Sequence, residues 1–256
     1  IYIMILKKKK LIKICISCVG GILIFDFIKS LKNQTDFDVF IVGIDKDISA
    51  HGKILCDKFY DVYDPKNENK YLNKLSNILI KNDIDIFFPL SDIECEVIVK
   101  NLNFLHRKNS KTYFWVGKSN PQEILTDKEK FLSFCKKNKF YIDKFNIIKD
   151  FDNFKKIANG TKKKKMILKS LHGSGSKGVF LINKNLRKSI NILKGRNCYE
   201  TNINYHKKTF NKKSKYVLMP YFKGDFFDVD CIADKGKLLD FSIRKRNNKN
   251  QFLFYS

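Results

Sequence analysis

A segment rich in lysine, glycine and serine lies between two apolar runs and is the sharpest chemical signal in the sequence. The first run delivers Lys169, and the second begins at Val179. Between them stand Gly173, Ser174, Gly175, Ser176, Lys177 and Gly178. Glycines let backbone N–H groups approach phosphate oxygens closely, serines add donors, and lysines supply countercharge. We interpret the segment as a phosphate-binding loop between two strands; a flexible hairpin turn is the alternative interpretation.

The spacing within this segment excludes two common phosphate-binding motifs. Lys177 is followed by Gly178, whereas a Walker A loop has Ser or Thr at that position and leads into a helix. A dinucleotide-binding fingerprint opens a helix directly after the first strand of its domain, and this segment comes late in the chain. Any phosphate loop here is therefore of another kind.

Further residues of chemical interest stand in order on both sides of the loop. Upstream, Thr126, Asp127 and Lys128 open a predicted helix. Downstream, an apolar run ends in Met219, Pro220, Tyr221 and Phe222, and then come Asp225, Arg244 and Arg246. Taken singly, the lysines are also explained as solvated surface residues and the arginines as a charged strand end. The ordered set favours the functional interpretation.

The first half of the chain alternates short apolar runs with helical patterns. Strands are predicted at Leu11–Val19, Asp38–Asp45, Lys58–Asp64, Asp85–Leu90 and Thr112–Gly117. This alternation is typical of a parallel sheet covered on both faces, whose ligands meet the carboxyl ends of the strands. Those ends carry Gly20-Gly21, Asp45 and Ser91-Asp92. Because Ser119-Asn120-Pro121 punctuates the chain, we predict one domain over residues 1–118 and a second over residues 119–256.

The second half predicts a mixture of helices and largely antiparallel strands. We expect helices at Asp127–Asn138, Phe151–Ala158 and Leu186–Leu193, with Asn197–Lys215 as a flexible insertion. Strands are expected at Phe145–Ile148, Met166–Leu171, Val179–Ile182, Tyr216–Phe222, Phe226–Ala233 and Leu238–Arg246. The last two are joined by a turn at Asp234–Lys237.

In this succession the chain resembles the ATP-grasp superfamily, and within it the carboxylate–amine ligases of the carbamoyl-phosphate-synthase-like kind. In that family an Asp-Lys pair starts a helix, a strand brings a lysine to a Gly/Ser-rich lid loop, a hinge strand cups adenine, and paired arginines follow. The resemblance runs from about Lys13 to Asn247. It implies an α/β protein with an N-terminal parallel-sheet, Rossmann-like pre-ATP-grasp domain. An α+β ATP-grasp domain follows, C-terminally incomplete, with a lid subdomain at about 143–215.

The resemblance also implies roles for individual residues. Lys128 and Lys169 would contact ATP phosphates, and Gly173–Gly178 would fold over them. The backbone of Met219, Pro220, Tyr221 and Phe222 would read adenine, with Asp225 nearby, and Arg244 and Arg246 would face the transferred phosphoryl group or the substrate carboxylate. The implied cofactors are ATP and Mg²⁺. The implied reaction activates a small-molecule carboxylate as an acyl phosphate and transfers it to an amine.

Several positions depart from the family's pattern. Ser170 follows Lys169 where the family has proline, and Met219-Pro220-Tyr221 stands where it has Gln-Glu-Tyr. The ribose-binding glutamate aligns with Phe226, next to Asp225. The family's magnesium carboxylates lie beyond the arginines, so we assign no metal ligands and expect a truncated or degenerate member. A catalytically inactive nucleotide-binding remnant or subunit is the second hypothesis.

The net charge of +25 over 256 residues raises a third hypothesis, nucleic-acid binding. The lysines are spread along the chain and do not interleave with aromatic residues as a stacking platform would, so we attribute the charge mainly to composition. We predict neither a nucleic-acid partner nor a membrane partner. The seven cysteines are scattered, odd in number and mostly inside apolar runs, which is typical of a reducing compartment, and we expect the cytoplasm. No metal-ligand spacing links the four histidines to one another or to cysteine pairs.

Overall fold

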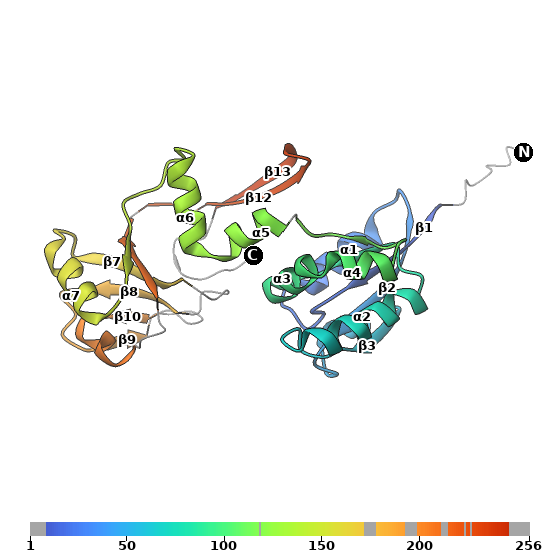
Figure 1. Cartoon of the computed structure of the whole chain (residues 1–256), viewed down its shortest axis with the longest axis horizontal. Coiled ribbons are helices and arrows are strands. Elements are labelled where there is room, and N and C mark those ends of the chain that lie inside the picture. Colours follow the sequence, from blue (N-terminus) through green and yellow to red (C-terminus); the bar gives the residue numbers. More distant parts are fainter. Residues whose placement is uncertain are drawn as a thin grey trace, which may run out of the picture. The chain divides into compact units, whose positions relative to one another are not determined.

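The structure is a computed structural model in which the chain forms two compact units, Ile1–Thr126 and Asp127–Ser256 (Figure 1). It describes residues 9–117, 119–171, 178–192, 199–210, 215–222, 224–225 and 227–245. The division falls eight residues beyond the predicted domain boundary, because the Ser119–Thr126 segment forms a helix, α5, that contacts helix α3 of the first unit. The proline at position 121 lies in the first turn of α5, where its missing N–H costs nothing.

The first unit is built on a parallel sheet of five strands in the order β3-β2-β1-β4-β5. The strands are β1 (Leu11–Ile16), β2 (Asp38–Asp45), β3 (Lys58–Asp61), β4 (Ile86–Phe88) and β5 (Tyr113–Phe114). Strands β2 and β3 are added on one side of β1, and β4 and β5 on its other side. The loops that follow β1 and β4 therefore diverge and leave a crevice at the carboxyl ends of these two strands.

Helices cover both faces of this sheet (Figure 1). The helices are α1 (Ile24–Asn33), η1 (His51–Leu55), α2 (Glu68–Lys81), α3 (Asp92–Lys100) and α4 (Leu102–Lys108). On one face, Ile24 and Ile28 of α1 pack with Ile14 and Ile41 of the strands. On the other face, α2, α3 and α4 enclose Phe87. The central strands β1, β2 and β4 are therefore covered on both sides, as parallel sheets require.

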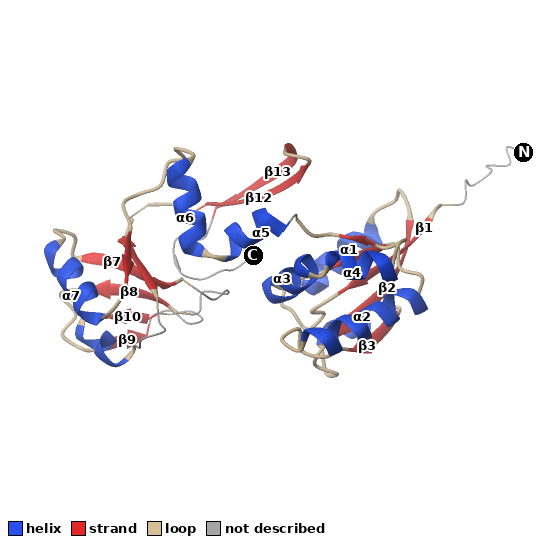
Figure 2. Cartoon of the chain, in the orientation of Figure 1, coloured by secondary structure: helices blue, strands red, loops and turns tan. Residues whose placement is uncertain are grey.

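The second unit contains a mixed sheet of six strands in the order β6-β11-β7-β8-β10-β9. Figure 2 labels four of them, β7, β8, β10 and β9, next to helix α7. The strands are β6 (Asn146–Ile148), β7 (Lys165–Ser170), β8 (Val179–Asn183), β9 (Ile190–Ile192), β10 (Tyr199–Thr201) and β11 (Tyr216–Pro220). Helix α7 (Phe151–Gly160) packs Phe154 and Ala158 on one face of this sheet. Helix α6 (Lys128–Lys137) packs Leu132 against Leu171 and Val217.

Two sequence predictions in this unit are wrong. The predicted helix at Leu186–Leu193 is instead the short strand β9, which pairs with β10. Isoleucine and asparagine are weak helix formers, so pairing with a neighbouring strand decides the conformation. The predicted flexible insertion at Asn197–Lys215 contains β10, which pairs with β8, and the 3-10 helix η2 (Asn204–Lys208) with its buried His206.

The chain's last described elements form a separate two-stranded antiparallel ribbon, β12 (Phe227–Asp234) and β13 (Lys237–Lys245). Lys235 and Gly236 connect the strands with φ angles of 48° and 81°, so both central turn residues are left-handed. Such turns match the twist of a hairpin, which confirms the predicted turn. Among the helices of the described ranges, none combines the length and apolarity needed to span a bilayer.

Candidate functional site

Strand β7 divides its side chains between the two faces of the six-stranded sheet. Its register pairs Lys169 with Val217 and Ile167 with Met219, so these four share one face. Met166 and Leu168 lie on the other face, in the core beneath α7. Lys169 therefore points away from α7, on the side where Leu132 of α6 packs against Val217. We call this side the lysine face.

The start of α6 brings a second lysine to the same side. Asp127 caps this helix by accepting hydrogen bonds from the backbone N–H groups of Glu129 and Lys130 at 2.8 and 3.1 Å, which confirms the predicted helix start. Lys128 is the first helical residue, and its Nζ donates to the carbonyl oxygen of Leu171 at 3.4 Å. Leu171 lies two residues after Lys169, so both lysines are placed where the chain enters the glycine- and serine-rich segment.

Most of that segment, Gly173, Ser174, Gly175, Ser176 and Lys177, lies outside the described residues. Its last residue, Gly178, accepts a hydrogen bond on its carbonyl oxygen from the Ser170 N–H at 2.9 Å. Gly178 has a φ of +74°, a conformation that side-chain-bearing residues rarely adopt. The glycine at this position is therefore required by the turn back into β8.

The end of β11 leaves one backbone edge open next to the lysine face. The Leu171 N–H donates a hydrogen bond to the carbonyl oxygen of Lys215, so the backbone groups of Lys215 face β7. Facing alternates along an antiparallel strand. The backbone N–H and C=O of Met219 therefore also face β7, and the backbone C=O of Pro220 faces away from it. Strand β6 pairs only as far as Leu218, so nothing in a ladder opposes Pro220 on that side. Proline lacks an N–H there, but its carbonyl oxygen remains an acceptor. Tyr221 and Phe222 continue beyond the strand, and Phe222 is half exposed.

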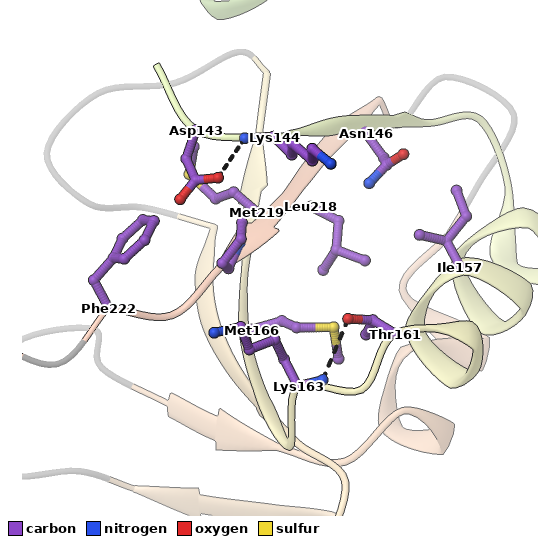
Figure 3. Close-up of a pocket in the computed structure, with 11 residues that line it drawn as sticks. Asp143, Lys144, Asn146, Ile157, Thr161, Lys163, Met166, Leu218, Met219 and Phe222 are labelled. Atoms are coloured by element: carbon purple, nitrogen blue, oxygen red, sulfur yellow. Dashed lines mark hydrogen bonds between the residues drawn. The ribbon is translucent and has the colours of Figure 1, made fainter. Parts of the chain in front are cut away.

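A cavity of about 400 Å³ lies beside this strand end, and Figure 3 shows its walls. Met166 and Leu218 enter it from the α7 face of the sheet, with Ile157 and Thr161 from the end of α7. Met219, Pro220 and Phe222 also line it. The cavity is lined by residues of both faces at this strand end, since Met219 shares the face of Lys169 while Met166 and Leu218 lie on the α7 face.

The acidic and basic residues predicted downstream lie on or next to the ribbon. Arg244 pairs with Asp230 at 2.8 Å, and Asp225 pairs with Lys245 at 2.6 Å. Arg246 and Phe226 lie outside the described residues. Within the described part of the chain, no group of three acidic, histidine or cysteine side chains is placed to hold a metal ion. These residues therefore do not fit a magnesium site, and we derive no step through the ion.

The first unit contains a buried carboxylate at the carboxyl ends of β1 and β4. Glu94 is only 3% exposed and accepts hydrogen bonds from Ser17, Cys18, Ser91 and Tyr71, the last at 2.9 Å. Burial, reinforced by the charge of Glu94, raises the pKa of the Cys18 thiol to about 12 and the pKa of the Tyr71 hydroxyl well above its usual value. Both groups therefore stay protonated as donors, and Cys18 is not a reactive thiolate.

The Gly20-Gly21 turn after β1 is also fixed by a hydrogen bond within the first unit. Asp45, at the end of β2, accepts a hydrogen bond from the Gly20 N–H at 2.8 Å. Ser91 caps α3 by accepting from the Glu94 N–H. The strand-end residues singled out in the sequence, Gly20, Asp45 and Ser91, thus meet at one edge of the sheet, where they fix the loops.

Comparison with known proteins identifies the fold. No protein-family profile matches the sequence, and no curated protein matches it. Among solved structures, N5-carboxyaminoimidazole synthetase from Staphylococcus aureus, complexed with ADP, is 17% identical with a TM-score of 0.65, covering 95% of this chain and 57% of that one. An L-amino acid ligase from Bacillus licheniformis is 10% identical with a TM-score of 0.59, over 96% of this chain and 53% of that one.

A third neighbour is the biotin carboxylase domain of the Hydrogenobacter thermophilus 2-oxoglutarate carboxylase, in complex with MgADP, ADP and bicarbonate. It is 16% identical with a TM-score of 0.51, over 85% of this chain and 45% of that one. All three neighbours are ATP-grasp enzymes. The chain therefore has the ATP-grasp fold, with an N-terminal parallel-sheet domain followed by mixed sheet and helices, as predicted. It spans slightly more than half the length of the first two neighbours.

Proposed function

We propose that this chain binds ATP on the lysine face, with its phosphates between Lys128 and Lys169, and activates a small-molecule carboxylate for transfer to an amine or similar nucleophile. The observation that carries the proposal is the hydrogen bond from Lys128 to the Leu171 carbonyl, because it sets both lysines at the entrance of the glycine- and serine-rich segment. In this proposal the first unit is the pre-ATP-grasp domain, and the second holds the lid subdomain over about 143–215.

The residues divide the work of binding. The two ammonium groups neutralise phosphate oxygens, and backbone N–H groups of the glycine-rich segment add donors. The Pro220 carbonyl, on the open edge of β11, accepts a hydrogen bond from the adenine amine. The γ-phosphoryl group passes to a carboxylate oxygen, which releases ADP and forms an acyl phosphate. The amine nitrogen then attacks the acyl carbon, phosphate leaves with the bonding pair, and the nitrogen loses a proton to solvent.

A second candidate is a nucleotide-binding protein without turnover. The pairing of Arg244 with Asp230 and of Asp225 with Lys245 favours it, because these charges are neutralised within the ribbon. Both candidates require nucleotide on the lysine face, so they share the first experiment and separate in the second.

The first experiment is the thermal shift of the purified chain with MgATP. We expect stabilisation of wild type, a smaller shift for Lys169→Ala, and an unchanged shift for Lys155→Ala on the exposed side of α7. Equal shifts for all three proteins would refute the site. The second experiment supplies ATP, the common amino acids and hydroxylamine. ADP together with a hydroxamate supports the ligase, whereas nucleotide binding without either product supports the second candidate.

A further inference from the structure

Strand β7 carries a second lysine, Lys165, on the lysine face, four residues before Lys169. Each residue of a strand adds about 3.3 Å, so the two Cα atoms lie about 13 Å apart. Lys165 stands next to Met166, which pairs with Pro220 at the open edge of β11. In the proposed site, Lys169 therefore lies at the phosphate end and Lys165 at the base end.

The charge of Lys165 is neutralised by a carboxylate on the same face. Glu200 of β10 pairs with Leu181 of β8, and Leu181 pairs with Ile167 of β7, so the Glu200 side chain also projects from the lysine face. Its Oε1 lies 3.0 Å from the Nζ of Lys165, and the Glu200 side chain is only 10% exposed. The two residues form an ion pair in which the acid is shielded from water and salt.

Two asparagines fix the carboxylate of Glu200. Asn183 Nδ2 donates to the same oxygen at 2.8 Å, and Asn191 adds a further hydrogen bond. Burial by itself raises the pKa of Glu200, but the hydrogen bonds from Lys165 and the asparagines outweigh it, and the pKa lies below its usual value. Glu200 therefore stays ionised at neutral pH and keeps its negative charge beside Lys165.

This burial distinguishes the Lys165–Glu200 pair from the ion pairs at the β12–β13 ribbon. There the acids Asp230 and Asp225 are 61% and 41% exposed. Exposed pairs contribute little to stability, whereas separating a buried acid from its partner leaves its charge uncompensated. An incoming anion that drew Lys165 away from Glu200 would leave such a charge behind, so the pair disfavours anion binding at the base end.

We propose that Glu200 is a positioning residue that sets the direction of the nucleotide on the lysine face by neutralising Lys165. The inference rests on the proposed function, because it takes this face as the nucleotide site. With Lys165 neutralised, phosphate oxygens gain more from Lys128 and Lys169 at the other end of the face. Without Glu200, the Lys165 ammonium group would bind phosphate oxygens at the base end as well, and the nucleotide would lie in both directions.

Titration calorimetry with two ligands, MgATP and magnesium tripolyphosphate, tests this role. Tripolyphosphate carries the phosphate charges of the nucleotide without its base, so it reports anion binding alone. Glu200→Gln keeps the size of the side chain and an acceptor oxygen for Asn183, and it removes the charge. We expect tripolyphosphate to bind Glu200→Gln about 3- to 10-fold more tightly than wild type, since a second lysine is free to bind it. ATP gains less, because in the reversed direction its base loses the Pro220 carbonyl, so the preference for ATP over tripolyphosphate falls.

Two further variants separate this role from a general effect of charge. Adding Lys165→Met to Glu200→Gln removes the freed ammonium group and is expected to restore the wild-type preference. Asp61→Asn changes the net charge of the chain by the same amount as Glu200→Gln, but it frees Lys74 in the first unit, so the preference should stay at the wild-type value. A gain in tripolyphosphate affinity that persists in the double variant, or that appears equally in Asp61→Asn, would overturn the proposal.

The same titrations distinguish failure of this inference from failure of the proposed function. If Lys169→Ala weakens ATP binding and Glu200→Gln leaves the preference unchanged, the nucleotide site stands and Glu200 does not set its direction. If Lys169→Ala binds both ligands as tightly as wild type, the site is refuted and the inference with it. Should Glu200→Gln fail to fold, Lys165→Met alone is measured. Because a neutralised Lys165 contributes nothing to either ligand, a loss of ATP or tripolyphosphate affinity in Lys165→Met would contradict the proposal.

Discussion

The Nζ of Lys128 lies 3.4 Å from the carbonyl oxygen of Leu171, although 43 residues separate them in the chain. This contact joins the first residue of α6 to the residue that follows β7. Lys169, two residues before Leu171, projects from the same face of the sheet that α6 covers. Lys128 and Lys169 thus lie on the same side of the sheet, next to the residue at which the chain leaves β7.

In the proposed site, replacing either lysine is expected to weaken nucleotide binding. A charge-assisted hydrogen bond contributes about 1.5–3 kcal/mol, so Lys128→Ala and Lys169→Ala are each expected to reduce ATP affinity by about 10- to 100-fold. Titration calorimetry measures the affinities, and Lys155→Ala on α7 serves as the control. In the proposed site both lysines contact one phosphate chain, so the double variant is expected to lose less than the sum of the two single losses. Strict additivity would argue that they contact separate ligands or none.

Removing the carboxylate of Glu94 destabilises the first unit. Glu94 receives hydrogen bonds from Ser17, Cys18, Ser91 and Tyr71, so Glu94→Ala leaves buried donors without an acceptor. We expect a loss of about 3 kcal/mol or more, and a smaller loss of about 1.5–3 kcal/mol for Tyr71→Phe, which removes one donor. The single tryptophan, Trp115, packs on Phe88 in this unit, so its fluorescence during urea unfolding reports the change. An unchanged midpoint for Glu94→Ala would show that the network contributes little.

The sequence predicted most of the strands because apolar runs bounded by glycine or polar turns leave few alternatives. The N-cap at Asp127 and the turn at Lys235-Gly236 could also be predicted from the sequence, since local chemistry determines both. Strand β9 could not be predicted in this way, because its conformation depends on pairing with β10 rather than on its own residues. The four donors around Glu94 come from positions as far apart as 17 and 91, and no local sequence pattern predicts such a cluster. The face of the sheet on which Lys169 lies also could not be predicted from the sequence, because it follows from the pairing of β7 with β11 in the structure.

Gly52 is a sensitive position for stability. Its N–H donates to the carbonyl oxygen of Val19 at 3.0 Å. A Cβ at this position would overlap that oxygen and lie 2.8 Å from the side chain of Ile24. Gly52→Ala is therefore expected to destabilise the first unit by about 1–3 kcal/mol, as overpacking does. Gly160→Ala is the comparison, because a Cβ at Gly160, the last residue of α7, meets nothing within 4 Å. It should be neutral or stabilising, and a similar loss for both variants would refute the steric explanation.

His206 makes the stability of the second unit depend on pH. Its ring is fully buried, with Nε2 2.8 Å from the Thr201 hydroxyl and Nδ1 3.1 Å from the Thr209 hydroxyl. Since Thr209 donates to the His206 carbonyl oxygen, it accepts from Nδ1–H, and Nε2 accepts from Thr201. Phe154 and Phe180 pack edge-on against the ring. Burial lowers the pKa of His206 from 6.5 to about 4, because this apolar surrounding disfavours the charged ring.

A histidine whose folded pKa lies below its unfolded value contributes stability above the unfolded pKa, and that contribution is lost as pH falls. For His206 the loss runs from pH 6.5 down to about 4 and amounts to about 3 kcal/mol in total. Chemical unfolding followed by circular dichroism, at about pH 7 and about pH 4.5, measures it. In His206→Gln the pH dependence between these two pH values should shrink by about 2 kcal/mol, most of the total, even though the variant is less stable near pH 7. If wild type and His206→Gln lose the same stability on acidification, other groups are responsible and the ring is not held neutral by the fold.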